Sequence, residues 1–461
     1  MNWKKWISIA AAVCLAVTAV PMRAVAQEEL LQEKMLEEIK EEIKEELKEE
    51  KEEPKEEKEE KEELKEEKEE KEKLQEKSDE KTEPQEESKK GLPKGISLLM
   101  EGENSTAVSE NEAADFEGEG EENDPYLIED VEDLKKLAEN VKNGTDYEGK
   151  YFQLTVNIDL KNEEWTPIGT IVYTGEFGRS EERYFKGTFD GDGHQIANLT
   201  ITGRNEYVGL FGYVRNATIQ NCNVAGEVSG YNAVGGIVGA VDGKTNNILN
   251  CSFQGNVTGN MYVGGIVGQV QNQCEVSSCY AIGTVHGGND KVGGIAGEGR
   301  GAIKNCYALA DVSAGGKFVG GIAGDASSVT IENCYYSGEV SARGSAGGIV
   351  GNVWRGTIQN CVSLAESVTA GINSVNRIAG GVRDNINLIN NHSYNRTKLV
   401  IDSKPAYPTG GAGNDVIGAD VYISNGRVMK DVQKGEVFAW TGFDKAIWYI
   451  PTEAGKLPSL Q

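Results

Sequence analysis

Cysteine is the residue type whose spacing in this chain most clearly calls for a chemical role. Six cysteines recur at steps of 29, 28, 27, 28 and 27 residues, at Cys222, Cys251, Cys279, Cys306, Cys334 and Cys361. Regularly spaced thiols could form disulfides or bind a metal. If one step is one structural repeat, however, all six side chains share one inward position, where cysteine acts as a small hydrophobe.

We therefore predict a ladder of buried free thiols. Disulfides between neighbouring repeats are the alternative, although parallel side chains in register do not readily reach the disulfide torsion. Cys274 is out of step with the series, lying five residues before Cys279, and we expect it in a loop.

Two more series keep step with the cysteines and face outward if the cysteines face inward, because side chains alternate along a strand. One residue after each cysteine stand Asn223, Ser252, Tyr280, Tyr307, Tyr335 and Val362. Five residues after each stand Glu227, Asn256, Thr284, Asp311, Glu339 and Glu366. Tyrosine rings offer apolar faces and a polar tip to sugars or partner proteins. The predicted ligand-binding face comprises Tyr280, Tyr307, Tyr335, Asp311, Glu339 and Glu366.

The same outward residues could serve catalysis or simply form a solvated surface. Carboxylates about 5 Å apart serve retaining glycosidases, so Asp311, Glu339 or Glu366 could belong to a polysaccharide hydrolase or lyase. No Arg, Lys or His cluster at matching intervals supports that alternative. Tyrosine and acidic residues also suit the exposed strands of an acidic protein that has no site there.

The series three residues after the cysteines is half apolar, which predicts either that this face is covered or that inward and outward sides are reversed. It consists of Ala225, Gln254, Ile282, Leu309, Ser337 and Leu364.

Metal chemistry has weak support. Residues 410–417 match the nonapeptide of calcium-binding β-rolls, but such sites need tandem copies, and one copy is typical of a loop. Asp190 and Asp192, separated by glycine, are typical of a turn. We predict no catalytic, cofactor-binding or metal-binding residues, with calcium as the alternative.

The elements that position these residues are repeated strands. VGLFG begins at Val208, VGGIVG at Val234 and Val263, VGGIAG at Val292 and Val319, and AGGIVG at Ala346. Each period of about 28 residues holds three short β-prone stretches and no helical one. Such a unit buries its apolar side only by stacking on copies of itself. We therefore predict a right-handed parallel β-helix of eight to ten coils, in which strands pair at about 4.8 Å.

A bend is predicted immediately before each cysteine, because the inward-facing parity of the side chains switches there. The residues at this position are Asn221, Asn250, Ser278, Asn305, Asn333 and Asn360. Asparagine tolerates the left-handed backbone that sharp corners need, and stacked amides can hydrogen-bond along the column.

The repeats resemble the GLUG motif of bacterial surface proteins, including the non-catalytic repeat region of immunoglobulin A-specific zinc metalloproteases. The resemblance covers residues 124–461, with similar strings at DPYLIEDVEDLKKLAENV, YFQLTVNIDL, WTPIG, GTFDGDGHQIANLTI and the closing WYIPTEAGKLPSLQ. It implies an extracellular or cell-surface role that is often adhesive. The zinc protease itself is excluded, because the chain lacks His-Glu-x-x-His and its three histidines, His194, His286 and His392, lie far apart in sequence.

The N-terminal sequence predicts export. Lys4 and Lys5 precede an apolar run over residues 7–20, and the small residues 24–26 suit cleavage before Gln27. Cys14 lacks a lipoprotein context, so we expect no lipidation there. No later stretch reaches the ~20 apolar residues of a membrane-spanning helix, so we expect no stable membrane insertion after signal cleavage.

A Glu/Lys-rich segment follows the predicted signal. Residues 27–90 carry 30 acidic and 16 basic side chains, about half of the net charge of −27. With so little apolar surface, we expect a spacer that is helical to about Glu53 and then disordered. A coiled coil over residues 31–47 is the alternative. The negative charge argues against nucleic acid as a partner, because phosphate binding relies on Lys and Arg.

The predicted domains are a signal peptide (1–26), a Glu/Lys-rich spacer (27–92), an acidic linker (93–123), an N-terminal cap with a helix over residues 129–143 and the first coils (124–207), the GLUG-type coils (208–391) and a β-rich closing segment (392–461). The leading functional hypothesis is an exported, non-catalytic, adhesin-like module that binds a glycan or a cell-surface protein. The polysaccharide hydrolase or lyase and a purely structural stalk are the alternatives.

Overall fold

The structure is a computed structural model that describes residues 116–174, 179–372, 374–382, 386–394, 396–406, 419–424, 427–429, 443–449 and 457–461. The chain divides into two units, Met1–Asn104 and Ser105–Gln461, and the described residues all belong to the second. The predicted signal peptide, the spacer and the 410–417 calcium motif lie outside the described residues. Within the described part, no helix is long and apolar enough to cross a membrane.

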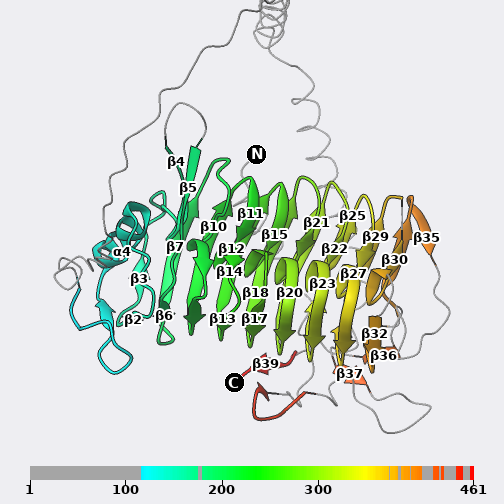
Figure 1. Ribbon diagram of the computed structural model, residues 1–461. Helices are drawn as coiled ribbons and strands as arrows, with labels where there is room; N and C mark the ends of the chain where they lie inside the picture. The colour runs from blue at the N-terminus through cyan, green and yellow to red at the C-terminus, as the bar shows by residue number, and fades with distance from the viewer. Residues whose placement is uncertain are drawn as a thin grey trace, which may run out of the picture. The chain divides into compact units, whose positions relative to one another are not determined.

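The second unit is the predicted parallel β-helix, with about nine turns (Figure 1). Its strands form three long sheets, in which each strand pairs with its counterpart one coil away. The central coil shows the pattern: β13 (Asn246–Leu249), β14 (Ser252–Gly259), β15 (Met261–Gly264) and β16 (Val267–Val270). The register is one full period, as in the pairing of Ser252 with Tyr280.

The first sheet contains two ladders that merge where the strands become long. One ladder contains β8 (Phe211–Arg215), β12 (Val238–Asp242) and β16. The other contains β6 (Thr188–Asp190), β9 (Thr218–Gln220), β13 and β17 (Cys274–Ser277). Both continue into β20 (Ala296–Lys304), β23 (Ala323–Glu332) and β27 (Val350–Gln359), and then separate into β31 (Ala379–Val382) and β32 (Ile386–Ile389).

The second sheet carries the predicted ligand-binding face. Its strands include β3 (Ile158–Asp159), β7 (Gln195–Ile201), β10 (Asn223–Ser229), β14, β18 (Tyr280–Gly287) and β21 (Tyr307–Ala314). Beyond β21 each coil contributes two shorter strands, β24 (Tyr335–Ser337) with β25 (Glu339–Ala342), and then β28 (Val362–Ser363) with β29 (Ser367–Ala370). The third sheet contains β11 (Asn232–Gly235), β15, β19 (Val292–Gly293), β22 (Val319–Gly320), β26 (Ala346–Gly347) and β30 (Val375–Asn376).

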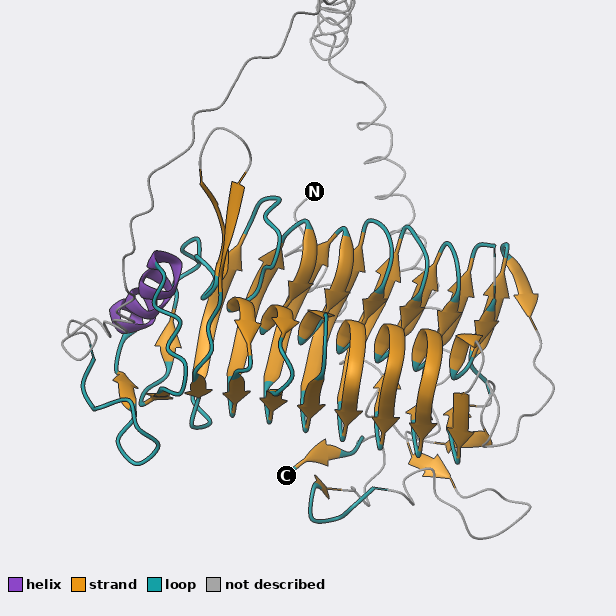
Figure 2. Ribbon diagram, viewed as in Figure 1, coloured by secondary structure: helices purple, strands orange, loops and turns teal. Residues whose placement is uncertain are grey.

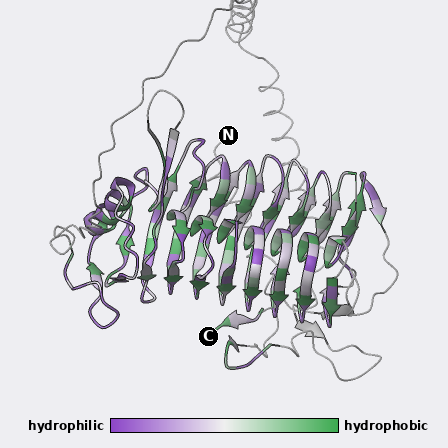
Figure 3. Cartoon of the chain, viewed as in Figure 1, coloured by the Kyte–Doolittle hydropathy of each residue, from purple (hydrophilic) through white to green (hydrophobic). Residues whose placement is uncertain are grey.

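Identical apolar positions stack along the inside of the coils. The isoleucines of the repeated strings are all fully buried, namely Ile237, Ile266, Ile295, Ile322 and Ile349. Figure 3 shows hydrophobic residues recurring in the strands from coil to coil. Stacking therefore gives each short repeat an apolar core that a single repeat lacks.

The predicted corner is confirmed. Asn250 has a φ of 52° and Asn333 a φ of 54°, and Ser278 adopts the same left-handed conformation with a φ of 55°. The amide of Asn250 donates to Oδ1 of Asn221 over 3.2 Å, and that of Asn333 donates to Oδ1 of Asn305 over 3.3 Å. Ser278 interrupts this amide ladder, because it has no amide group.

The glycines of the repeated string are required by close backbone packing. A Cβ on Gly264 would lie 2.1 Å from the carbonyl oxygen of Val267, and a Cβ on Gly268 would lie 2.5 Å from the backbone nitrogen of Val234. Neither distance allows a methyl group. The glycines therefore recur in every repeat, because this segment packs against backbone atoms of its own coil and of the neighbouring coil.

The N-terminal cap contains the predicted helix. Helix α4 spans Val131–Asn143, between β1 (Tyr126–Ile128) and β2 (Tyr151–Leu154) (Figure 2). The Asp130 side chain accepts hydrogen bonds at its N-terminus, and Gly144, with a φ of 114°, ends it.

The core includes residues that the sequence assigns to the linker. Phe116 is buried and packs 5.4 Å from Phe152 between ring centroids. The expected linker boundary at residue 123 is therefore wrong, because an aromatic cluster around Phe152 recruits residues on its N-terminal side.

The coils also continue past residue 391, so the predicted boundary there is wrong. Strand β33 (His392–Tyr394) pairs in parallel with β28, and β34 (Lys398–Ile401) pairs in parallel with β29. Asn391 takes the place of the cysteine: its amide donates to Ile358 O over 2.8 Å and its Oδ1 accepts from Cys361 N over 3.0 Å. A polar residue thus fills the inward position with its hydrogen bonds satisfied.

Antiparallel pairs follow these last coils. They are β34 with β35 (Lys404–Ala406), β36 (Ala419–Ser424) with β37 (Arg427–Met429), and β38 (Trp448–Tyr449) with β39 (Ser459–Leu460). The earlier hairpin of β4 (Thr170–Thr174) and β5 (Arg179–Arg183) is antiparallel too.

We predict that Gly264→Ala destabilises the β-helix by roughly 1–3 kcal/mol, because the added methyl group overpacks a backbone contact. Gly288→Ala is the matched control, since the nearest atom to a Cβ there is 3.4 Å away. Urea unfolding followed by circular dichroism measures both. Equal stability of the two variants would contradict a packing origin for the motif.

Candidate functional site

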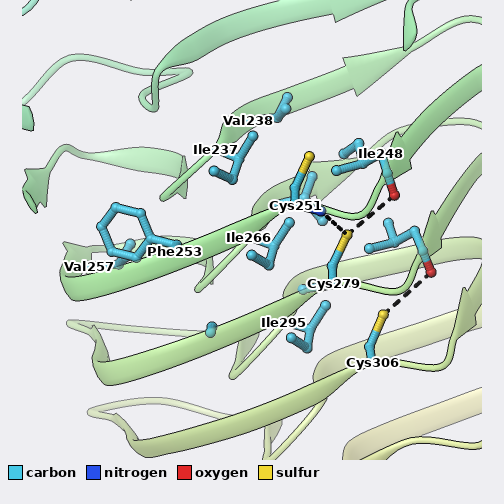
Figure 4. Packing of buried hydrophobic residues seen from close by; sticks show 14 of the residues in the cluster. Ile237, Val238, Ile248, Cys251, Phe253, Val257, Ile266, Cys279, Ile295 and Cys306 are labelled. Atoms are coloured by element: carbon cyan, nitrogen blue, oxygen red, sulfur yellow. Dashed lines mark hydrogen bonds between the residues drawn. The ribbon is translucent and has the colours of Figure 1, made fainter. Parts of the chain in front are cut away.

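The six regularly spaced cysteines form the predicted ladder of buried free thiols. Figure 4 shows Cys251, Cys279 and Cys306 at successive levels of the core. In five of the six coils the thiol donates to the carbonyl two residues earlier, as from Cys251 Sγ to Leu249 O over 3.2 Å. Burial raises the pKa of Cys222 to about 12, so the thiol form predominates there at neutral pH. The column stabilises the core by packing.

The expectation for Cys274 was wrong. It lies at the start of strand β17, where it pairs with Asn246 on one side and Gly301 on the other, and its side chain is buried. Burial raises its pKa as well. Its position in a paired strand explains why a cysteine outside the regular series is also part of the core.

The tyrosines of the predicted ligand-binding face form a continuous stack. The Tyr280 and Tyr307 ring centroids lie 4.9 Å apart with planes at 2°, and those of Tyr307 and Tyr335 lie 5.0 Å apart with planes at 6°. The rings belong to a cluster separate from the core that holds the thiol column, so the predicted alternation is confirmed. Their exposure is not, because Tyr307 is 7% exposed and Tyr335 is fully buried.

The last described residues of the predicted closing segment, 443–449 and 457–461, cover this stack, and the name closing segment is kept for them below. The Trp448 ring lies 6.0 Å from Tyr307 and 5.8 Å from Tyr335, and the Tyr335 hydroxyl donates to Pro458 O over 2.6 Å. Leu309 packs in the same apolar cluster. The half-apolar series is therefore explained by a covered sheet face, and the assignment of inward and outward sides is correct.

A cleft of about 430 Å³ lies at the margin of this cover. It is lined by Asn221, Asn250, Ser278 and Tyr280 of the coils and by Ile447, Leu460 and Gln461 of the closing segment. Tyr280 is partly exposed, unlike the two tyrosines beyond it. Of the six residues of the predicted ligand-binding face, only Tyr280 lines this cleft.

The acidic column of the second sheet is exposed, as its outward position predicts. Asp311 and Glu339 are solvent-exposed in consecutive coils, and Asp311 Oδ1 accepts from the Glu339 backbone over 3.1 Å. Glu366 is not the next member of the column, which corrects the prediction. Glu339 pairs with Ser367, because one additional residue between Ser363 and Ser367 shifts the register.

A charge network centred on the buried Glu298 was not predicted from the sequence. The Lys291 ammonium lies 3.2 Å from Glu298 Oε1 and 3.0 Å from Asp325 Oδ2. Gln269 and Asn352 donate to these two carboxylates from the neighbouring coils. The four residues of this network recur at steps of 29, 27 and 27 residues, at Gln269, Glu298, Asp325 and Asn352. The same periodicity that marks the cysteines therefore marks them in the sequence. Each carboxylate already has an amide and an ammonium partner, which fits a structural network.

The other polar candidates are separated. Asp190 accepts from Asp192 N over 2.8 Å and from the Gln220 and Asn221 side chains, which is consistent with the predicted turn. His392 is buried, and burial lowers its pKa. Among the residues that the structure describes, no group of three His, Cys, Asp or Glu side chains could hold a metal.

Comparison with known proteins confirms the motif and the fold. The family model described as the GLUG motif matches residues 259–285, one coil of the β-helix. A solved structure titled as a "putative immunoglobulin A1 protease" from Bacteroides ovatus is 23% identical, with a TM-score of 0.51 over 75% of this chain and 94% of that chain. At this identity the likeness shows the fold alone.

Two curated proteins match parts of the sequence. "Halomucin" from Haloquadratum walsbyi is 28% identical over 193 residues, which is 40% of this chain. A "Putative Gly-rich membrane protein" from Evansella cellulosilytica is 31% identical over 140 residues, which is 29% of this chain. The matches span only 2% and 14% of the two relatives' lengths. Each relative is therefore a much larger protein, and its similarity to this chain concerns a limited segment.

We predict that native protein without signal peptide takes up no alkylating label on its seven described thiols, because all are buried. In denaturant, without reductant, the same protein should take up seven labels, which intact mass measures. Fewer than seven labels in denaturant, with two labels missing for each bond, would instead demonstrate disulfides.

We predict that Trp448→Ala detaches the closing segment, because its ring contacts Tyr307, Tyr335 and Phe443. Truncation of a large buried aromatic side chain to alanine lowers the free energy of unfolding by about 3–5 kcal/mol. Limited proteolysis should then cleave the segment at least tenfold faster. Tyr449→Ala, on a neighbouring ring that is 52% exposed, should leave the cleavage rate unchanged. Similar cleavage of both variants would contradict the anchoring role of Trp448.

Proposed function

We propose that this chain is a non-catalytic binding module that acts outside the cell and binds a glycan along its β-helix. The export-type N-terminus supports the location. The names of the two partial relatives, a halomucin and a Gly-rich membrane protein, are compatible with it. The GLUG coil supports a repeat module of the kind found in surface proteins.

The exposed polar column of the second sheet is the observation that carries this proposal. Glu227, Thr284, Asp311 and Glu339 are solvent-exposed and belong to coils that stack in register. The Asn256 amide donates to both carboxylate oxygens of Glu227 over 2.9 Å. Such a column places hydrogen-bonding groups at the coil spacing of about 4.8 Å, which suits a linear polymer with repeated hydroxyl groups.

Rigidity supports binding at this column as well. The side chains project from strands whose backbones are paired on both sides, so little conformational entropy is lost when a ligand is held. A carbohydrate has many hydroxyl groups, and carboxylate and amide oxygens accept hydrogen bonds from them.

A glycan array probed with the full chain without its signal peptide tests the proposal. We expect binding to a subset of oligosaccharides, and about tenfold weaker binding, or ~1.4 kcal/mol, by the double variant Asp311→Asn/Glu339→Gln. Glu139→Gln on helix α4 is a matched control at another exposed carboxylate. Absence of any glycan binding by the parent protein would overturn the proposal.

The same preparation tests the enzymatic alternative, which the neighbouring carboxylates Asp311 and Glu339 keep open. Neutral and uronate-rich polysaccharides are incubated with the protein, and chain length is followed by size-exclusion chromatography. Shortening that disappears in Asp311→Asn would replace the binding proposal with a polysaccharide hydrolase or lyase.

A further inference from the structure

We propose that the cleft at the margin of the closing segment is a sugar-binding site, in which one pyranose ring stacks on Tyr280. The inference rests on the proposed glycan-binding function and adds to the exposed polar column a second contact for the glycan, at Tyr280 in the same sheet. Tyr280 is the partly exposed end of the tyrosine stack. The site would give this end of the stack a function.

The aromatic surface comes from the end of the stack. One face of the Tyr280 ring lies against Tyr307, with ring centroids 4.9 Å apart. On the other side the column continues with Ser252, which pairs directly with Tyr280 in the neighbouring strand. The Ser252 hydroxyl donates to Asn223 Oδ1 over 2.7 Å, so this small side chain is held toward the next coil. Ser252 itself is buried, so the column of rings ends at Tyr280, and a flat ligand can meet the Tyr280 ring in the cleft that this ring lines.

The polar groups come from the interruption of the amide ladder. Asn250 donates to Asn221, but Ser278 on its other side has no amide to donate to Asn250 Oδ1. The interruption thus leaves an amide oxygen and the Ser278 hydroxyl at the wall of the cleft that Tyr280 also lines. The coils farther along contrast with this, because Asn333 donates to Asn305 there.

The chemistry of these groups favours a sugar over other small ligands. A pyranose has an apolar face of C–H groups that suits an aromatic ring, and equatorial hydroxyl groups that suit amides and hydroxyls. The side chains that line the cleft among the described residues are amides, hydroxyls and apolar groups. Its volume of about 430 Å³ falls within the range of about 300–1,000 Å³ for small-molecule sites.

The closing segment completes the site. Ile447 and Leu460 extend the apolar surface, and the Gln461 amide donates to Lys445 O over 2.8 Å and to Trp448 O over 3.2 Å, which leaves its carbonyl oxygen as an acceptor. Two parts of the chain distant in sequence therefore form the cleft together. The site exists only when the closing segment is docked.

Saturation-transfer difference NMR on the full chain without signal peptide tests the inference. The probes are cellobiose, lactose, maltose, chitobiose and digalacturonate, each offered alone, together with the strongest ligand from the glycan array. We expect Tyr280→Ala to weaken binding at least tenfold and Tyr280→Phe to preserve it, because phenylalanine keeps the ring. Tyr231→Ala is the control, since this tyrosine is 40% exposed and does not line the cleft.

A second variant distinguishes the loss of the binding site from the loss of the fold. In Ser252→Tyr the new ring would extend the stack beyond Tyr280 from a position that is 6% exposed in the parent, so binding should be lost, and thermal unfolding of the variant checks that the fold is kept. Binding by Tyr280→Ala and Ser252→Tyr equal to that of the parent would overturn the site but leave glycan binding intact. Failure of the parent protein to bind any glycan, on the array or in solution, would overturn both.

Discussion

Parallel backbone pairing between successive coils is the interaction on which this structure depends. Strands inside the stack of coils form hydrogen bonds with strands about 28 residues away on both sides, so a residue type repeated at that interval becomes a column in space. Inside the coils, columns of isoleucine and cysteine provide the core. Outside, columns of amides and carboxylates, with Tyr280 at the open end of the tyrosine stack, give the surface its chemistry. One constraint therefore determines both stability and the spacing of the binding groups.

The columns are most informative where they change. The amide ladder is broken at Ser278, the tyrosine stack ends beside Ser252, and the acidic column is shifted at Glu366. The first two changes meet in one cleft with the closing segment. A repeat that was perfectly regular would offer identical surfaces on every coil, whereas these irregularities distinguish one place along the β-helix from the others.

The sequence predicts those features that depend on contacts one period apart. The thiol ladder, the corner at Asn250 and the direction of Tyr307 all follow from parity and period. The burial of Tyr335 could not be predicted in this way, because the hydroxyl bonds to Pro458, 123 residues away in a segment without the repeat. The same holds for Phe116, which joins the core through tertiary aromatic contacts.

The central claim is that the tyrosine stack is closed over Tyr335 and open for a sugar at Tyr280. A crystal structure of the chain without signal peptide, soaked with its strongest glycan ligand, tests this claim most directly. We expect Trp448 packed on Tyr335 and a sugar ring parallel to Tyr280 at about the 4.9 Å spacing of the stack. The absence of a sugar ring at Tyr280, or a Tyr280 ring covered by protein, would contradict it.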